Sequence, residues 1–296
     1  MSFLVTTDSG CDLPRALLEE KHIVPFLFSY AVDGEAYRDT MRPEDCHAFY
    51  ERMRAGAIPK TSQINLQQFM DFWRPLLTQG LPIVHISLGS GVSGTYRNGT
   101  LAAQMLMDEV PGAQIHVVDS TLCSTGYGML ALKAAELRDA GSTAAECAAW
   151  LRENSIRVDS WFMTDELSYL RRSGRCSRAT AAVGSALHIY PIIDFDAAGH
   201  LVVQERVRGL EKTLARIHAL VGQTVENAAQ QTLYICHSDV PRQAQAFGEA
   251  LQQEFGFRDV CDTYIGTIIG ANCGPGLMAA FYYGKPRTVD GSPGRS

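Results

Sequence analysis

The chain has 296 residues, enough for one large or two ordinary domains, and a net charge of −6 at pH 7. It has no concentrated basic run, which excludes an ordinary nucleic-acid-binding surface. No apolar stretch approaches the roughly 20 residues of a membrane span, and the N-terminus lacks the basic region and cleavage site of a signal peptide. We therefore expect a cytoplasmic globular protein with no nucleic-acid partner.

Eight cysteines are spread along the chain beside apolar residues. They form no Cys-x-x-Cys pair and no Cys/His cluster with the spacing of metal ligands. In a chain of this length without an export signal, they are expected to be reduced thiols packed in the interior. We predict no metal site.

Strand-like and helix-like segments alternate through residues 1–158. Apolar runs predict strands at 3–7, 81–86 and 113–119, and Asp33-Gly34 predicts a hairpin turn. Asp12 is expected to cap a helix over 12–21 that has Pro14 in its first turn. The alternation predicts an α/β/α domain with a parallel sheet. The turns that follow its strands should meet at one edge, namely Asp8-Ser9, Ser87–Thr95 and Asp119–Thr121.

The loop Ser87-Leu-Gly-Ser-Gly-Val-Ser-Gly-Thr95 separates a predicted strand from a helix over 96–107. Backbone N–H groups at a helix N-terminus favour an anion, and the hydroxyls of Ser90, Ser93 and Thr95 add uncharged donors. The sequence therefore predicts a phosphate or carboxylate site here.

A second pair of hydroxyls, Thr61 and Ser62, precedes a predicted helix over 66–77. Two interpretations stay open. Either hydroxyl could cap that helix, or the pair could face the Gly/Ser loop and contribute to the same anion site.

Residues 159–284 predict a second α/β domain with a mixed sheet. A β-hairpin is expected over 190–195 and 201–205, and helices over 211–221 and 241–255. The glycine-rich stretch 265–281 predicts either an apolar wall or a turn into a terminal helix or strand. Residues 285–296 are polar and contain Pro and Gly, which predicts a mobile tail.

Five motifs in this order resemble the DegV family, over about residues 1–285. They are Thr61-Ser-Gln63, Ser90-Gly-Val-Ser-Gly-Thr-Tyr96, Val118-Asp-Ser120, Leu167-Ser-Tyr-Leu-Arg-Arg-Ser-Gly-Arg175 and Ile269-Gly-Ala-Asn-Cys-Gly-Pro-Gly276. The resemblance implies a two-domain α/β protein, with an N-terminal α/β/α parallel sheet and a C-terminal mixed sheet. It also implies a bound long-chain fatty acid as ligand and no cofactor.

The resemblance further implies which residues hold the acyl carboxylate. Thr61 and Ser93 match the threonine and serine that hydrogen-bond it, and Arg175 matches an arginine expected nearby. The adjoining headgroup-binding residues are expected to be Ser62, Gly94, Thr95 and Asn272. A buried carboxylate needs such donors because an unpaired buried charge is costly.

Family members present the acyl carboxyl to a separate kinase that forms an acyl phosphate. The resemblance thus implies a carrier and not an enzyme, and the chain contains no Gly-x-x-x-x-Gly-Lys-Ser/Thr phosphate loop. Arg208 is expected to contact the kinase, the competing interpretation being an exposed salt bridge. Peripheral contact with a membrane is expected during lipid exchange.

Two positions depart from the family pattern. Asn272 stands where members often carry His, and Asn can donate a hydrogen bond but cannot become cationic. Ile64 replaces the usual proline, which removes a rigid turn but keeps both hydroxyls.

Two enzymatic functions are the alternatives to a carrier. A hydrolase with Ser93 as nucleophile would need Gly-x-Ser-x-Gly, but position 95 is Thr, and His85 is expected inside a strand as a core residue. An enzyme acting on a small phosphorylated substrate would fit the Gly/Ser loop, but no metal cluster or covalent histidine supports it.

Overall fold

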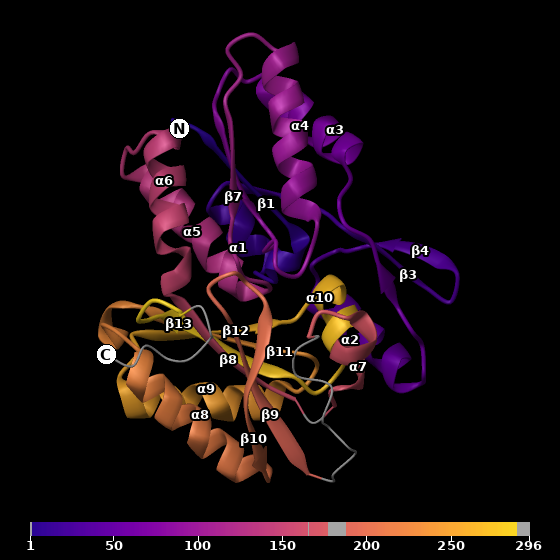
Figure 1. The fold of residues 1–296 in the computed structure, drawn as a ribbon, viewed down its shortest axis with the longest axis vertical. Helices are drawn as coiled ribbons and strands as arrows, with labels where there is room; N and C mark the ends of the chain where they lie inside the picture. The colour runs from indigo at the N-terminus through magenta and orange to yellow at the C-terminus, as the bar shows by residue number, and fades with distance from the viewer. Residues whose placement is uncertain (1, 165, 177–187, 289–296) are drawn as a thin grey trace.

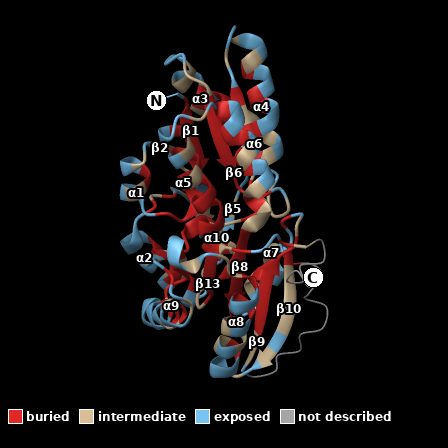
Figure 2. Cartoon of the chain, turned by 90° about the vertical axis from the view of Figure 1, so that its left-hand side faces the viewer, coloured by how far each residue is buried: buried red, intermediate tan, exposed pale blue. Residues whose placement is uncertain are grey.

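The computed structural model describes residues 2–164, 166–176 and 188–288. Figure 1 shows an N-terminal sheet with its helices stacked on a larger C-terminal sheet. In Figure 2 the central strands of both sheets are buried, whereas the edge strand Leu201–Arg208 of the larger sheet is mostly intermediate. The flanking helices expose their outer faces.

The N-terminal sheet is parallel, as predicted, with strand order β2-β1-β6-β7. Its strands are β1 (Leu4–Asp8), β2 (Ile23–Phe26), β6 (Ile83–Ser87) and β7 (Ile115–Asp119). Every residue of β1 and β6 is buried, as expected for strands covered on both faces. In Figure 1, α5 (Thr125–Asp139) and α6 (Ala144–Asn154) lie on one side of this sheet, and α3 (Leu66–Leu77) and α4 (Thr95–Glu109) lie on the other.

A small antiparallel sheet leads into the first hydroxyl pair. It joins β3 (Ser29–Val32), β4 (Glu35–Arg38) and β5 (Lys60–Thr61), and α2 (Pro43–Arg54) precedes β5 in the chain. Asp33 and Gly34 have φ angles of 53° and 86°, which confirms the predicted hairpin turn. The pairing of Thr61 with Tyr30 fixes the position of the Thr61 backbone.

The C-terminal sheet is mixed, as predicted, with order β10-β9-β8-β13-β11-β12. Its strands are β8 (Val158–Met163), β9 (Ile189–Phe195), β10 (Leu201–Arg208), β11 (Thr232–His237), β12 (Asp259–Tyr264) and β13 (Met278–Tyr283). Only β11 and β12 run parallel among these pairs of described strands. The remaining helices are α1 (Arg15–Glu20), α7 (Ser168–Ser173), α8 (Leu210–Thr224), α9 (Pro241–Phe255) and α10 (Thr267–Cys273), with short 3₁₀ turns at Ser9–Cys11, Ser155–Arg157 and Ala228–Gln230.

The two faces of β13 belong to different cores. Met278, Ala280 and Tyr282 pack in the cluster that contains residues of α8 and α9. Ala279 and Phe281 belong to the large cluster that continues into the N-terminal half. This alternation follows from the two-residue period of a strand, and it means that one apolar core joins both halves of the molecule.

The prediction that Asp12 caps the first helix is wrong. Helix α1 begins at Arg15, and Pro14 occupies the position before it. Asp12 is buried with a φ of 51°, and it accepts hydrogen bonds from the Gly266 backbone N–H and the Ser124 hydroxyl. The aspartate therefore ties the N-terminal half to the start of α10.

The predicted mobile tail differs from the structure in its first residues. The backbone N–H of Lys285 donates to the carbonyl of Thr224. Arg287 is 7% exposed and donates to the carbonyls of Thr121, Asp196 and Ser155. Residues 289–296 lie outside the described residues. The predicted domain boundary at 158 and 159 falls at the first residues of β8 and remains a proposal.

Candidate functional site

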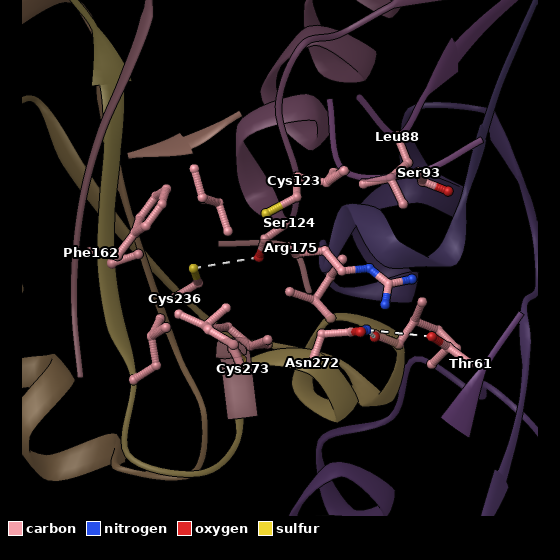
Figure 3. A pocket seen from close by; sticks show the side chains of 18 of the residues that line it. Thr61, Leu88, Ser93, Cys123, Ser124, Phe162, Arg175, Cys236, Asn272 and Cys273 are labelled. Atoms are coloured by element: carbon pink, nitrogen blue, oxygen red, sulfur yellow. Dashed lines mark hydrogen bonds between the residues drawn. The ribbon is translucent and has the colours of Figure 1, made fainter. Parts of the chain in front are cut away.

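A cavity of about 430 Å³ lies between the two halves, within the range of about 300–1,000 Å³ typical of small-molecule sites. Figure 3 shows it from close by. Most of its lining is apolar: Phe28, Leu88, Val92, Cys123, Phe162, Leu170, Leu201, Cys236, Ile265, Ile268, Ile269, Cys273, Leu277, Ala279 and Phe281. The polar lining residues are Thr61, Ser62, Gln63, Ser93, Gly94, Ser124, Arg175 and Asn272.

Most of the polar groups gather at one side of the cavity, and Ser124 lies apart from them beside Cys236. In Figure 3, Thr61, Ser93, Arg175 and Asn272 lie together at the polar side, and Phe162 lies on the opposite side. Six of the seven predicted carboxylate-binding residues therefore line one cavity, although they come from four separate segments of the chain. A polar end and a long apolar remainder suit an amphiphilic ligand.

Ser93 stands immediately before the N-terminus of α4. Its Oγ lies 2.9 Å from Thr95 Oγ1 and accepts a hydrogen bond from the Thr95 backbone N–H at 3.2 Å. The N-cap residue of this helix is Gly94, which has no side chain to cap it. When Thr95 Oγ1 donates to Ser93, the Ser93 hydroxyl proton is free to donate into the cavity at the positive end of the helix.

Thr95 is the seventh predicted carboxylate-binding residue, and it does not line the cavity. It is fully buried behind Ser93 and contacts that side chain. The sequence pattern did not reveal this, because the direction of the Thr95 side chain depends on where the helix begins, and α4 begins at Thr95 itself. The contact between the two hydroxyls positions the Ser93 side chain.

Thr61 is free of the capping role that the sequence left open. Asn65 caps α3 through a capping box with Gln68. Asn272 Nδ2 donates to Thr61 Oγ1 at 3.4 Å and to the carbonyl of Ile268 at 2.9 Å. Because Thr61 accepts this bond, its own hydroxyl proton can point to a ligand.

The Gly/Ser loop is held by the turns that follow the neighbouring strands. The backbone N–H groups of Leu88 and Ser90 donate to the carboxylates of Asp8 and Asp119, which confirms the prediction that these turns meet at one edge. A Cβ atom at Gly91 would collide with the backbone carbonyl of Gly199. Glycine is thus required where the loop meets the β9–β10 turn of the other half.

Arg175 and Arg208 lie in different surroundings. Arg175 follows α7, donates to the carbonyl of Ser173 at 2.5 Å, and is exposed at the polar side of the cavity. Arg208 is the exposed last residue of β10. Leu201, at the start of that strand, lines the cavity, so Arg208 lies roughly 23 Å away along the strand at about 3.3 Å per residue.

Three thiols in the lining were not anticipated as site residues. Cys123, Cys236 and Cys273 come from distant parts of the sequence, so no spacing signal connects them. Burial raises the pKa of all three, that of Cys236 to about 12. They are therefore neutral at physiological pH and act as apolar wall. Six of the eight cysteines are buried, as expected.

The structure gives Ser93 no histidine base among the described residues that line the cavity. His85 is a core residue, as expected: it is fully buried in β6, bonds to Thr6, and packs on the rings of Phe69 and Trp73. Burial lowers the pKa of His85 to about 3. The observed hydrogen bonds of Ser93 thus do not favour the hydrolase alternative.

The family of the chain follows from its similarity to known proteins. A family model described as "Uncharacterised protein, DegV family" matches residues 2–285. A DegV domain-containing protein of Clostridium perfringens is 31% identical over 286 residues, which cover 96% of this chain and 98% of that protein. The chain belongs to the DegV family.

Solved structures of DegV proteins share the fold. DegV of Bacillus subtilis, described as a fatty acid binding protein, has a TM-score of 0.84 at 28% identity, over 96% of this chain and all of that one. A DegV lipid binding protein from Thermotoga maritima has a TM-score of 0.84 at 25% identity, over 97% of this chain and all of that one. A DegV family protein from Thermus thermophilus, described by its fatty acid binding, has a TM-score of 0.81 at 26% identity, over 96% of this chain and all of that one.

Two further features concern the described residues only. None of the helices there combines the length and apolar character needed to cross a bilayer. No group of three or more His, Cys, Asp or Glu side chains in that part of the chain is arranged to hold a metal ion.

Proposed function

We propose that the protein binds one long-chain fatty acid, with its carboxylate between Thr61 and Ser93 and its tail in the apolar part of the cavity. The observation that carries this proposal is the cavity itself, which has hydroxyl, amide and guanidinium donors at one side and mainly apolar walls elsewhere. The fatty-acid-binding DegV structures of at least 25% identity support the same ligand class.

The headgroup and the tail contribute differently to binding. Burial of each methylene group contributes roughly 0.8 kcal/mol, so a long tail supplies most of the affinity. The carboxylate is then held by the two hydroxyl donors, by Arg175 and by the N-terminus of α4, and these contacts fix the direction of the acyl chain. Ser62, Gly94 and Asn272 complete the surroundings of the headgroup.

We propose that the bound acid is a cargo and not a substrate that this chain converts. On this proposal a separate cytoplasmic kinase phosphorylates the acyl carboxyl, and Arg208 contributes to its docking surface away from the cavity. Asn272 would orient Thr61 without supplying a positive charge. Lipid exchange would take place by peripheral contact with a membrane.

The test of ligand class is extraction of the purified protein with organic solvent followed by mass spectrometry. We expect one long-chain fatty acid per chain. An empty cavity after expression in lipid-replete cells, or a phosphorylated sugar in the extract, would contradict the proposal. Incubation of the loaded protein with a DegV-partner acyl kinase and ATP tests the carrier role separately, because only acyl phosphate formation supports it.

A further inference from the structure

A second cavity, of about 250 Å³, adjoins the start of α10. Its lining shares no residue with the first cavity and consists of Ser9, Asp12, Leu13, Pro14, Asp39, Met41, Pro43, Cys46, His237, Pro241, Asp262, Thr263, Tyr264 and Gly266. Three of these residues are aspartates, and none of the described lining residues is Lys or Arg. The cavity is therefore rich in acceptors and lacks a cation of its own.

Both carboxylate oxygens of Asp12 already accept a hydrogen bond from another part of the chain. One of its carboxylate oxygens accepts from the Gly266 backbone N–H, and the other accepts from the Ser124 hydroxyl. The acidic acceptors of the cavity with the fewest partners are thus Asp39 Oδ2 and the carboxylate of Asp262.

Asp39 is 2% exposed, and its Oδ2 atom has no hydrogen-bond partner among the described residues. Its Oδ1 accepts from the backbone N–H of Met41 at 3.3 Å. Burial raises the pKa of Asp39, and the nearby Ser9 and Thr267 hydroxyls, which favour its charged form, complete no hydrogen bond to Oδ2. Oδ2 lies 3.9 Å from the point where a Cβ on Gly266 would stand, at the wall of the cavity. A buried acceptor left in this state is costly, and a donor from a ligand would satisfy it.

Asp262 supplies a second acceptor nearer to solvent. Its side chain is 40% exposed, and burial raises its pKa to about 6, so it is mostly ionised at neutral pH. The nearest histidine nitrogen, His237 Nε2, is 3.7 Å away, beyond hydrogen-bond distance. Burial lowers the pKa of His237 to about 4, and its Nδ1 accepts from the backbone N–H of Val240. The imidazole is therefore neutral and does not neutralise Asp262.

The rest of the lining suits an alkyl group and not a bare metal ion. Apolar surface comes from Leu13, Pro14, Met41, Pro43 and Pro241, and the ring of Tyr264 packs edge-on against His237 with centroids 4.4 Å apart. No group of three or more acidic, His or Cys side chains in the described part of the chain is arranged for a metal ion. Two acidic side chains beside apolar surface in one cavity match a cation that combines N–H donors with an alkyl chain.

We infer that this cavity is a second ligand site, which binds an organic ammonium ion through Asp39 Oδ2 and the Asp262 carboxylate, with its alkyl part against Met41 and Tyr264. This inference does not rest on the fatty-acid site, since the two cavities are lined by different residues. The chemistry selects a primary alkylamine in its protonated form.

The test is calorimetric titration of the purified full chain at neutral pH and low ionic strength with n-butylammonium chloride. The neutral analogue n-butanol and magnesium chloride are titrated in parallel. We compare the wild type with Asp262→Asn and Asp39→Asn, and use Asp259→Asn, an exposed aspartate on the same strand as Asp262, as the matched control. Circular dichroism establishes that each variant is folded.

Saturable binding of one butylammonium ion per chain, weakened about tenfold or more by Asp262→Asn and unchanged by Asp259→Asn, would support the inference. Asp39→Asn should weaken binding similarly. Because Asp262 is partly exposed, its variant remains informative if Asp39→Asn fails to fold. The inference is overturned if butylammonium shows no saturable binding at millimolar concentration, if n-butanol binds equally well, if magnesium binds in its place, or if the two β12 variants behave alike.

Discussion

Ser93→Ala is the most direct perturbation of the proposed headgroup clamp. The change removes the hydroxyl that faces the cavity and leaves the Thr95 hydroxyl and backbone N–H without their Ser93 partner. A hydrogen bond to a charged group contributes about 1.5–3 kcal/mol. We therefore expect fatty-acid affinity to fall by roughly ten- to hundredfold.

The same arithmetic limits the effect of removing both hydroxyls. Thr61→Val keeps the shape of the side chain, and the double variant should lose about 3–6 kcal/mol if the two contributions add. Both donors serve one carboxylate, so the loss should be smaller than the sum. The tail of a sixteen-carbon acid contributes roughly 12 kcal/mol at about 0.8 kcal/mol per carbon. Binding should therefore weaken but persist, with its preference for long chains unchanged.

A displacement assay with a fluorescent fatty acid measures these affinities. The wild type should bind the free acid more tightly than its methyl ester, and the double variant should lose most of this difference. Ser90→Ala is the matched control, because Ser90 is on the same loop but does not line the cavity. Equal losses for Ser93→Ala and Ser90→Ala, or an intact preference for the acid in the double variant, would refute the headgroup assignment.

Three other outcomes follow from the structure. Ala279→Leu adds bulk to the cavity wall, so mass spectrometry should show shorter bound acyl chains; an unchanged length distribution would place the tail elsewhere. Arg287→Ala should lower the free energy of unfolding in urea by about 1–3 kcal/mol or more, because the carbonyls of Thr121, Asp196 and Ser155 lose their buried donor; an unchanged free energy of unfolding would contradict this. Burial lowers the pKa of His85 from 6.5 to about 3, so between these pH values the unfolded chain binds a proton at His85 that the folded protein does not. The free energy of unfolding should therefore decrease as the pH falls from 6.5 toward 3. In His85→Gln this loss of unfolding free energy should be smaller by about 3 kcal/mol near pH 4. An unaltered dependence of stability on pH would show that His85 is not its source.

The parts of the fold that depend on local patterns were predictable. The helix over 66–77 and the Asp33-Gly34 turn agree with the structure at their boundaries. Asp12 shows where such patterns fail. An aspartate two residues before Pro14 is typical of a helix N-cap. The groups that donate hydrogen bonds to Asp12, however, belong to Gly266 and Ser124, which lie more than a hundred residues away in the sequence. Strand β12 was not anticipated, because its sequence, Asp-Val-Cys-Asp-Thr-Tyr, is short and only partly apolar.

For the candidate site, the sequence predicted the polar residues but not the direction of Thr95 or the cysteines of the wall. Motif order placed Thr61 and Ser93 in one site, and the structure brings both to one cavity. The orientation of Thr95 depends on where α4 begins, which the loop sequence does not determine to within a residue. The wall thiols were missed because tertiary packing alone brings Cys123, Cys236 and Cys273 together.

The central position of β13 has a consequence for the order of folding. This strand lies between β8 and β11, although it follows both in the chain, so the mixed sheet cannot close until residues 278–283 have been synthesised. The parallel sheet needs only residues up to 119 and can form earlier on the ribosome. Ala279 and Phe281 of β13 also form part of the cavity wall. The cavity is therefore completed only after residue 281 has been synthesised, and a nascent chain has no finished site for a ligand before that point.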